Sequence, residues 1–205
     1  MDKLNSKPVR PDSYYKMVVL DLDNTLLSPA KKISPRSLET VGYIKALGLK
    51  IVLASARSLR SVQPYYYQLG LTDPVIVLDG ALIYSLHKNE CLLSQPFEQE
   101  GMTDLLLLLR SYGLNTTFYT AEGWHIEKLT SAIHRHIKNG FTEPPDSIGK
   151  LDSLLKSGQP VLKIMFKVPD RPNEHKRLYE DLGYFSALIS VVNSIGPLRS
   201  LSPKG

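Results

Sequence analysis

The chain has 205 residues, of which 42% are hydrophobic and 22% are charged, as in an ordinary folded globular protein. Its single cysteine, Cys91, excludes an internal disulfide and suits the reducing cytoplasm, where we expect the protein. No apolar run approaches the ~20 residues of a membrane-spanning helix, so we expect no membrane partner. The net charge of +5 is spread along the chain, which favours small anionic partners over nucleic acid.

The first predicted element is a short apolar strand, Met17–Leu20, which runs into the segment Asp21–Thr25. A β-branched run that is apolar on both faces is typical of a buried parallel strand. Because strand side chains alternate, Asp21 and Asp23 should leave on one side and Leu22 on the other. Carboxylates at the end of such a strand lie where open α/β sheets bind ligands, and Mg²⁺ would relieve their repulsion. The alternative is an Asx-rich turn without chemistry, which the flanking apolar residues disfavour.

A helix and a second strand follow and predict a parallel pair of strands. Ser34 and Pro35 are typical of a helix N-terminus, and Gly48 is typical of a helix end. Lys50–Ala54 is a second apolar strand. The order strand, helix, strand implies a right-handed βαβ unit.

Polar residues follow the next two strand ends as well. Ser55 and Arg57 come directly after the second strand, a helix is predicted over Ser58–Leu69, and Asp79 follows a third strand at Pro74–Leu78. A hydroxyl at a strand end is often only a helix cap, so Ser55 alone is a weak signal.

From residue 82 to about residue 194 the regular alternation ends, which predicts a mixed α+β layer. The helix predicted at Gly101–Tyr112 has an apolar stripe. In this region we expect His125 to be structural and Lys163 to face solvent, because it alternates with apolar residues. The other predicted elements are a hairpin at Leu82–Tyr84 and Cys91–Leu93, strands at Asn115–Tyr119, Trp124–Glu127, Pro160–Val168 and Ala187–Val192, and helices at Leu129–Lys138 and Pro172–Leu182.

The segment Asp21–Thr25 resembles the first motif of the haloacid dehalogenase-like (HAD) superfamily, Asp-x-Asp-x-Thr after a hydrophobic strand. Ser55-Ala56-Arg57 and Asp79-Gly80-Ala81 resemble the Thr-Gly-Arg and Asn-Gly-Ala of its Cof-type branch (subfamily IIB). The resemblance implies an α/β fold, in which a Rossmann-like parallel-sheet core carries an inserted α+β cap. The implied division is a flexible tail at 1–15, the first part of the core at 16–81, the cap at 82–194 and the start of a return to the core at 195–205.

The resemblance also implies a Mg²⁺-dependent phosphatase for small, sugar phosphate-like metabolites. Asp21 would be the nucleophile that forms an aspartyl phosphate, and Asp23 the acid and then the base. Thr25, Ser55 and Arg57 would bind phosphate or support its site. Asp21 and Asp23 would hold the metal.

The sequence departs from the family pattern at several positions. Ala56 replaces a Gly, and Asp79 replaces an Asn, so that Asp79 would either weaken phosphate binding or pair with Arg57. Lys204 matches either a Lys that precedes the core lysine or that lysine itself, and we favour the former. The acidic motif that completes the metal site is not found, so we expect a C-terminally truncated member with an exposed apolar edge at Met17–Leu22 and impaired hydrolysis. The alternative is a non-catalytic HAD-like relic that binds phosphate or a partner.

Overall fold

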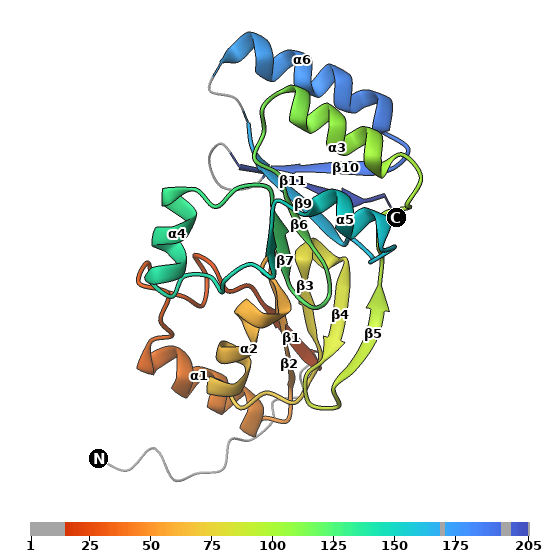
Figure 1. The fold of residues 1–205 in the computed structure, drawn as a ribbon. Coiled ribbons are helices and arrows are strands. Elements are labelled where there is room, and N and C mark those ends of the chain that lie inside the picture. The colour runs from red at the N-terminus through yellow and green to blue at the C-terminus, as the bar shows by residue number, and fades with distance from the viewer. Residues whose placement is uncertain (1–14, 169–170, 194–197, 205) are drawn as a thin grey trace, which may run out of the picture.

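The computed structural model describes residues 15–168, 171–193 and 198–204, and it contains a sheet of five strands and a sheet of six (Figure 1). The predicted tail at 1–15 lies almost entirely outside the described residues. None of the helices in these described ranges has the length and apolarity that crossing a bilayer requires.

The first sheet has the order β1-β2-β3-β4-β5 and contains the predicted parallel unit. Strands β1 (Met17–Leu20), β2 (Lys50–Ala54) and β3 (Val75–Val77) are parallel. Strands β4 (Leu82–Ser85) and β5 (Glu90–Ser94) continue this sheet as an antiparallel hairpin. The carboxyl ends of β1, β2 and β3 therefore meet at one edge of the sheet, and the candidate residues follow these ends.

Two helices connect the parallel strands, α1 (Pro35–Ala46) and α2 (Leu59–Gln68), and they lie together beside the sheet (Figure 1). Each is preceded by a serine whose hydroxyl accepts a hydrogen bond from the amide three residues later. Such N-caps satisfy one of the unpaired amides at the start of a helix, which fixes where the helix begins. The predicted start at Ser34-Pro35 is confirmed.

The second sheet has the order β10-β11-β9-β6-β7-β8. Helices α3 and α6 contribute to one buried apolar cluster and lie side by side over β10 and β11, whereas α4 lies near the loops of the first sheet (Figure 1). The strands are β6 (Thr117–Tyr119), β7 (Trp124–Ile126), β8 (Ser147–Ile148), β9 (Lys163–Lys167), β10 (Ile189–Asn193) and β11 (Leu198–Pro203). The helices are α3 (Met102–Ser111), α4 (Ser131–Lys138), α5 (Leu151–Lys156) and α6 (Pro172–Leu182), and short 3-10 turns occur at Leu78–Gly80 and Gly183–Phe185.

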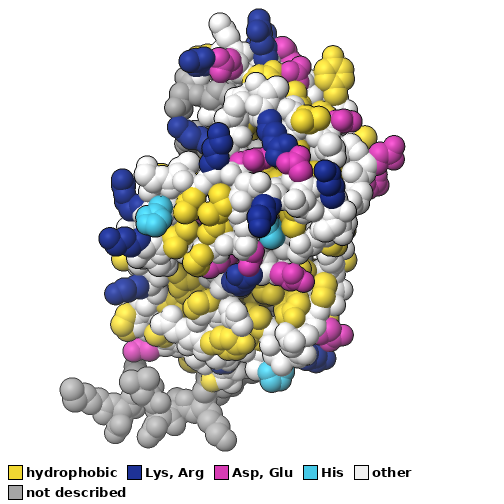
Figure 2. All heavy atoms as spheres, viewed as in Figure 1, with side chains coloured by type: hydrophobic (Ala, Val, Ile, Leu, Met, Phe, Trp, Pro, Cys, Tyr) yellow, Lys and Arg dark blue, Asp and Glu magenta, His cyan; other side chains and the backbone are white. Residues whose placement is uncertain are grey.

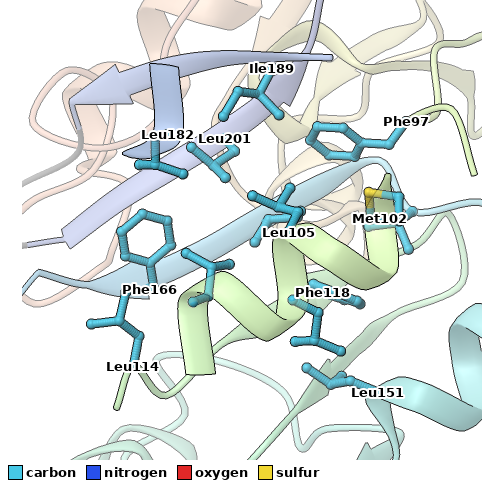
Figure 3. Close-up of a cluster of buried hydrophobic side chains, with 14 of the residues drawn as sticks. Phe97, Met102, Leu105, Leu114, Phe118, Leu151, Phe166, Leu182, Ile189 and Leu201 are labelled. Atoms are coloured by element: carbon cyan, nitrogen blue, oxygen red, sulfur yellow. The ribbon is translucent and has the colours of Figure 1, made fainter. Parts of the chain in front are cut away.

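Each sheet has its own apolar core. In the second sheet, Leu105 of α3 packs with Phe118 and Phe166 of the strands beneath it (Figure 3). The apolar cluster of the first sheet surrounds β2 and β3, and it also includes Leu162, which directly precedes β9. The two cores thus approach each other where β9 begins, and this junction borders the candidate site.

Sheet membership divides the chain at places other than those predicted. The β4–β5 hairpin pairs with β3 and extends the first sheet, whereas we predicted it as the start of the cap. Strand β11 lies between β10 and β9, whereas we predicted residues 195–205 as a return to the core. Periodicity identifies a strand but not the sheet that it joins, which explains both differences.

Smaller differences concern the ends of the two sheets. Strand β8 and helix α5 were not predicted, because runs of two and six residues carry too little periodicity. Strand β1 pairs only with β2 among the described strands, and Met17 and Val19 are 50% and 51% exposed. The expected exposed apolar edge is therefore present in this structure.

Candidate active site

The loop after β1 places two carboxylates in one cleft. Leu22 is fully buried, whereas Asp21 and Asp23 both line a cavity of about 750 Å³. The predicted alternation along Asp21–Asp23 is confirmed. The amide of Leu22 donates to Asp21 Oδ1 at 2.7 Å, which helps to hold that carboxylate at the start of the loop. A cavity of this size is typical of a site for a small molecule.

Two cations flank Asp23. Arg57 donates from Nε to Oδ2 at 2.6 Å and from Nη2 to Oδ1 at 2.8 Å, and Lys31 Nζ lies 2.5 Å from Oδ1. The hydrogen bond from Arg57 lowers the pKa of Asp23 to about 2, against the opposing effect of burial and with further help from Lys31. Asp23 therefore stays ionised at neutral pH, and the hydrogen bond to Asp23, with its charge, raises the pKa of Arg57 against the effect of burial.

The turn after β2 presents Ser55 and Arg57 to the same cavity. Ser55 is 8% exposed, and its hydroxyl accepts a hydrogen bond from the Arg57 amide at 3.3 Å. The Arg57 guanidinium lies 5.5 Å from the ring centroid of Tyr65, whose hydroxyl donates to the Lys31 carbonyl at 3.1 Å. Tyr65 thus contacts the side chain of Arg57 and the backbone of Lys31, the two residues that flank Asp23.

Asp79 pairs with the second sheet rather than with Arg57. Lys163 Nζ lies 2.9 Å from Asp79 Oδ2, and the Ser200 hydroxyl donates to the same oxygen at 3.0 Å. Asp79 has a φ of 58°, a left-handed conformation that Asp and Asn tolerate better than most residues. Of the two alternatives, pairing with Arg57 is therefore wrong in this structure.

The second sheet and its loops close the cleft from the other side. Glu143 accepts hydrogen bonds from the hydroxyls of Ser58 and Ser61, and Arg60 Nη2 lies 2.6 Å from Asp146 Oδ1. Burial, with the nearby charges of Glu143 and Asp79, raises the pKa of Tyr119, so its hydroxyl remains protonated. The residues that line the cavity from this side are Tyr119, His136, Phe141, Thr142, Lys163, Met165 and Leu198.

For Thr25, Lys204 and Lys163, the structure does not support one of the roles or positions considered in the sequence analysis. Thr25 is exposed and does not line the cavity, so its phosphate-binding role is not supported by its position. Lys204 donates from Nζ to the Ser186 carbonyl at 2.9 Å, outside the cavity lining, so its position does not support a role as the core lysine. Lys163 is 3% exposed, so the prediction that it faces solvent is wrong.

Lys31, Lys163 and Met165 were not predicted as site residues, because local periodicity does not show which distant segment a side chain contacts. Lys163 and Met165 lie on the face of β9 opposite to the core residue Ile164, as alternation requires, but the first sheet rather than solvent covers this face. Lys31 reaches Asp23 from a loop residue with a φ of 57°. Its position shortly after Asp21–Thr25 was the available signal, but a loop has no periodicity that would show where its side chain points.

The two carboxylates of the cleft are candidate ligands for a divalent metal. Within the described residues, no group of three or more His, Cys, Asp or Glu side chains could hold a metal ion. Asp21 and Asp23 offer hard oxygen donors, and Mg²⁺ is commonly held by one or two carboxylates together with water and substrate phosphate. Asp21 therefore offers the freer carboxylate to Mg²⁺, with a phosphate as a further ligand, whereas both oxygens of Asp23 already pair with Arg57 and Lys31.

On the face drawn in Figure 2, Lys and Arg side chains and Asp and Glu side chains both occur from the top of the molecule to the bottom. This agrees with the expectation from the sequence that the net charge is spread.

Comparison with known proteins places these features in a family. The model for haloacid dehalogenase-like hydrolases matches residues 18–205. Pyridoxal phosphate phosphatase YbhA of Escherichia coli is 26% identical over 149 residues, covering 71% of this chain and 55% of that protein. Putative phosphatase YxeH of Bacillus subtilis is 26% identical over 167 residues, covering 80% of this chain and 61% of that protein.

The fold has a counterpart of known structure. A haloacid dehalogenase-like hydrolase from Bacteroides thetaiotaomicron superimposes with a TM-score of 0.77 at 23% identity, covering 93% of this chain and 72% of that one. The chain thus spans less than two thirds of the length of the two curated relatives named above. The family match and the fold agree with the motifs at Asp21–Thr25 and Ser55–Arg57, and the chain belongs to the haloacid dehalogenase-like hydrolase family, as its Cof-type resemblance predicts.

Proposed function

We propose that this chain carries the active site of a Mg²⁺-dependent phosphatase that hydrolyses small phosphorylated metabolites, with sugar phosphates as the first class to test. The observation that carries the proposal is the placement of Asp21, Asp23, Ser55 and Arg57 around one cavity of about 750 Å³. Named relatives support the reaction class, since one is a pyridoxal phosphate phosphatase and another a putative phosphatase.

In the proposed reaction, an oxygen of Asp21 attacks phosphorus and forms an aspartyl phosphate, which water then hydrolyses. Asp23 would protonate the leaving oxygen and later take a proton from that water. Its ionised state beside Arg57 and Lys31 suits the second step. In the first step Asp23 must first gain a proton, and a bound phosphate dianion would favour this by drawing Arg57 and Lys31 away from the Asp23 carboxylate.

Charge balance explains what the surrounding residues contribute. A phosphate dianion beside two carboxylates needs compensating positive charge, which Arg57 and Lys31 supply in part. Mg²⁺ held by Asp21 and Asp23 would add the charge that stabilises the transferring phosphoryl group. Ser55 offers a hydroxyl for a phosphate oxygen, and the apolar side chains of Phe141 and Leu198 would exclude water from the leaving group.

The test is Mg²⁺-dependent hydrolysis of p-nitrophenyl phosphate and of a panel of sugar phosphates by the intact protein. Asp21→Asn should abolish turnover, because an amide cannot form the covalent intermediate. Asp23→Asn should lower turnover by about 10²–10⁴-fold and leave a phosphoenzyme that acid quenching traps. Asp152→Asn is the matched control, because Asp152 pairs with Arg110 outside the cavity lining and should leave turnover unchanged.

A second candidate function is phosphate binding without turnover. It is motivated by the small donor set, since Asp21 and Asp23 line the cavity without a third described carboxylate in a metal-binding group. An intact protein that binds inorganic phosphate but gives no Mg²⁺-dependent turnover, with Asp21→Asn having no effect, would favour this function over hydrolysis.

A further inference from the structure

Lys163 is a buried cation in contact with the edge of the candidate site. It belongs to β9 of the second sheet and is 3% exposed. Its ammonium donates to the Ala56 carbonyl at 2.8 Å and lies 2.9 Å from Asp79 Oδ2. Burying an ammonium is costly unless a counter-charge and hydrogen bonds compensate, and here both partners belong to loops of the first sheet.

Asp79 joins the two sheets at the same point. Its carboxylate pairs with the Lys163 ammonium of β9 and accepts a hydrogen bond from the Ser200 hydroxyl of β11. These two strands are adjacent in the second sheet. Its backbone and that of Leu78 are left-handed, with φ of 58° and 54°. A bulky residue in this region is uncommon, so the surrounding contacts must hold the loop in this shape.

Ala56 connects this pair to the predicted phosphate-binding groups. It lies between Ser55, whose hydroxyl accepts a hydrogen bond from the Arg57 amide, and Arg57, which donates two hydrogen bonds to Asp23. A carbonyl held by a fixed ammonium restricts the turn on which both side chains stand. Displacements of about 1 Å in such groups can cost about 10²-fold in rate, so the restraint bears on function.

We propose that Lys163, held by Asp79 in the wall of the cavity, is a positioning residue that fixes the turn Ser55–Arg57 for phosphate by acting through the Ala56 carbonyl. The proposal rests on the proposed function for its kinetic consequence, but the geometric restraint itself does not depend on turnover. It also gives a role to the acidic residue at position 79. The carboxylate anchors Lys163, and its charge is compensated by that lysine instead of facing the phosphate alone.

A buried ion pair can also be purely structural, and the two roles give different results when both charges are removed together. Replacing a buried pair by neutral groups often restores stability, whereas removing one partner leaves an uncompensated charge. A double variant, Lys163→Met with Asp79→Asn, should therefore be more stable than Lys163→Met alone. Asn at position 79 also tolerates the left-handed backbone. The Ala56 carbonyl, however, still lacks its donor in the double variant.

The experiment uses the intact protein. It measures the environment of the Arg57 side chain by NMR and the affinity for phosphate, neither of which requires turnover, and then the rate of hydrolysis. In the double variant, the Nε–H resonance of Arg57 should shift, the dissociation constant for inorganic phosphate should rise about tenfold, and kcat/KM for p-nitrophenyl phosphate should fall by up to about 10²-fold. Lys163→Arg keeps a donor and the charge, so it should bring all three quantities closer to their wild-type values than the double variant does. Lys45→Met is the control, since Lys45 also donates to main-chain carbonyls, those of Leu69 and Gly70, but outside the cleft lining.

The outcomes separate this proposal from the proposed function. If the double variant folds and keeps the wild-type Arg57 resonance and phosphate affinity, Lys163 is only a structural ion pair and the proposal is wrong. If the wild-type protein shows no turnover but the Arg57 resonance and phosphate affinity change as expected, the positioning role stands and the phosphatase function fails. Equal losses in Lys45→Met would also overturn the proposal, because they would show a general effect on stability.

Discussion

The two sheets of this protein carry different kinds of residues at the positions that matter. Around the first sheet, the loops that line the cleft contain charged side chains, and Asn24, Lys31 and Asp79 there have left-handed backbones. Beneath α3 in the second sheet, by contrast, the side chains are apolar and buried (Figure 3). The difference indicates that the first sheet holds its chemistry in constrained loops, while the second provides a packed wall that keeps those loops in place.

Removing packing from the second sheet should have the largest effect. Leu105 is fully buried in the cluster between α3 and the strands. Leu105→Ala should lower the free energy of unfolding by about 2–5 kcal/mol, because it removes apolar contacts and leaves a cavity. Leu107→Ala on the same helix is the control, since Leu107 is 54% exposed and its loss should change stability by about 0.5 kcal/mol or less. Urea unfolding followed by circular dichroism measures both variants.

Equal destabilisation by Leu105→Ala and Leu107→Ala would contradict this assignment of the core. It would mean that helix propensity, rather than packing against the sheet, accounts for the contribution of α3. The comparison between the sheets would then lose its energetic basis.

Relieving or increasing backbone constraint in the first sheet should have an intermediate effect. Asn24 follows Asp23 with a φ of 59° and an exposed side chain. Asn24→Ala should destabilise the protein by about 1–2 kcal/mol, because Ala disfavours the left-handed region. Asn24→Gly should change stability little, since Gly reaches this region readily. Thermal unfolding of the two variants checks the prediction, and an Ala variant as stable as the Gly variant would show that the loop is not constrained.

The sequence predicted the parts of the fold that follow from local periodicity. The parallel strands β1, β2 and β3, their two helices and the stripe of α3 occur where the apolar patterns place them. The carboxylates Asp21 and Asp23 also line one cleft with Leu22 buried between them, as alternation predicted, although they lie in the loop directly after β1. Local rules of this kind need no knowledge of the rest of the chain.

Long-range pairing could not be predicted in the same way. The same alternation placed Lys163 correctly on the face of β9 opposite to Ile164, but it could not show that the first sheet covers that face. The pairing of Asp79 with Lys163 and the insertion of β11 beside β9 depend on contacts between distant segments. Lys31 was missed because loop residues with left-handed backbones leave no periodic trace in the sequence.

The smallest stability change is expected at the outer edge of the first sheet, where the effect should appear as association instead. Val19 is 51% exposed on β1, and β1 pairs only with β2 among the described strands. An apolar edge with free backbone groups is a template for pairing with another chain, and a lysine at such an edge opposes this. Val19→Lys should therefore change the free energy of unfolding by about 0.5 kcal/mol or less but reduce aggregation.

Leu107→Lys adds the same charge on an exposed helix position and separates the effect of the edge from that of net charge. Light scattering during storage at equal concentration is the measurement, and equal protection by both lysines would show that the β1 edge does not drive association.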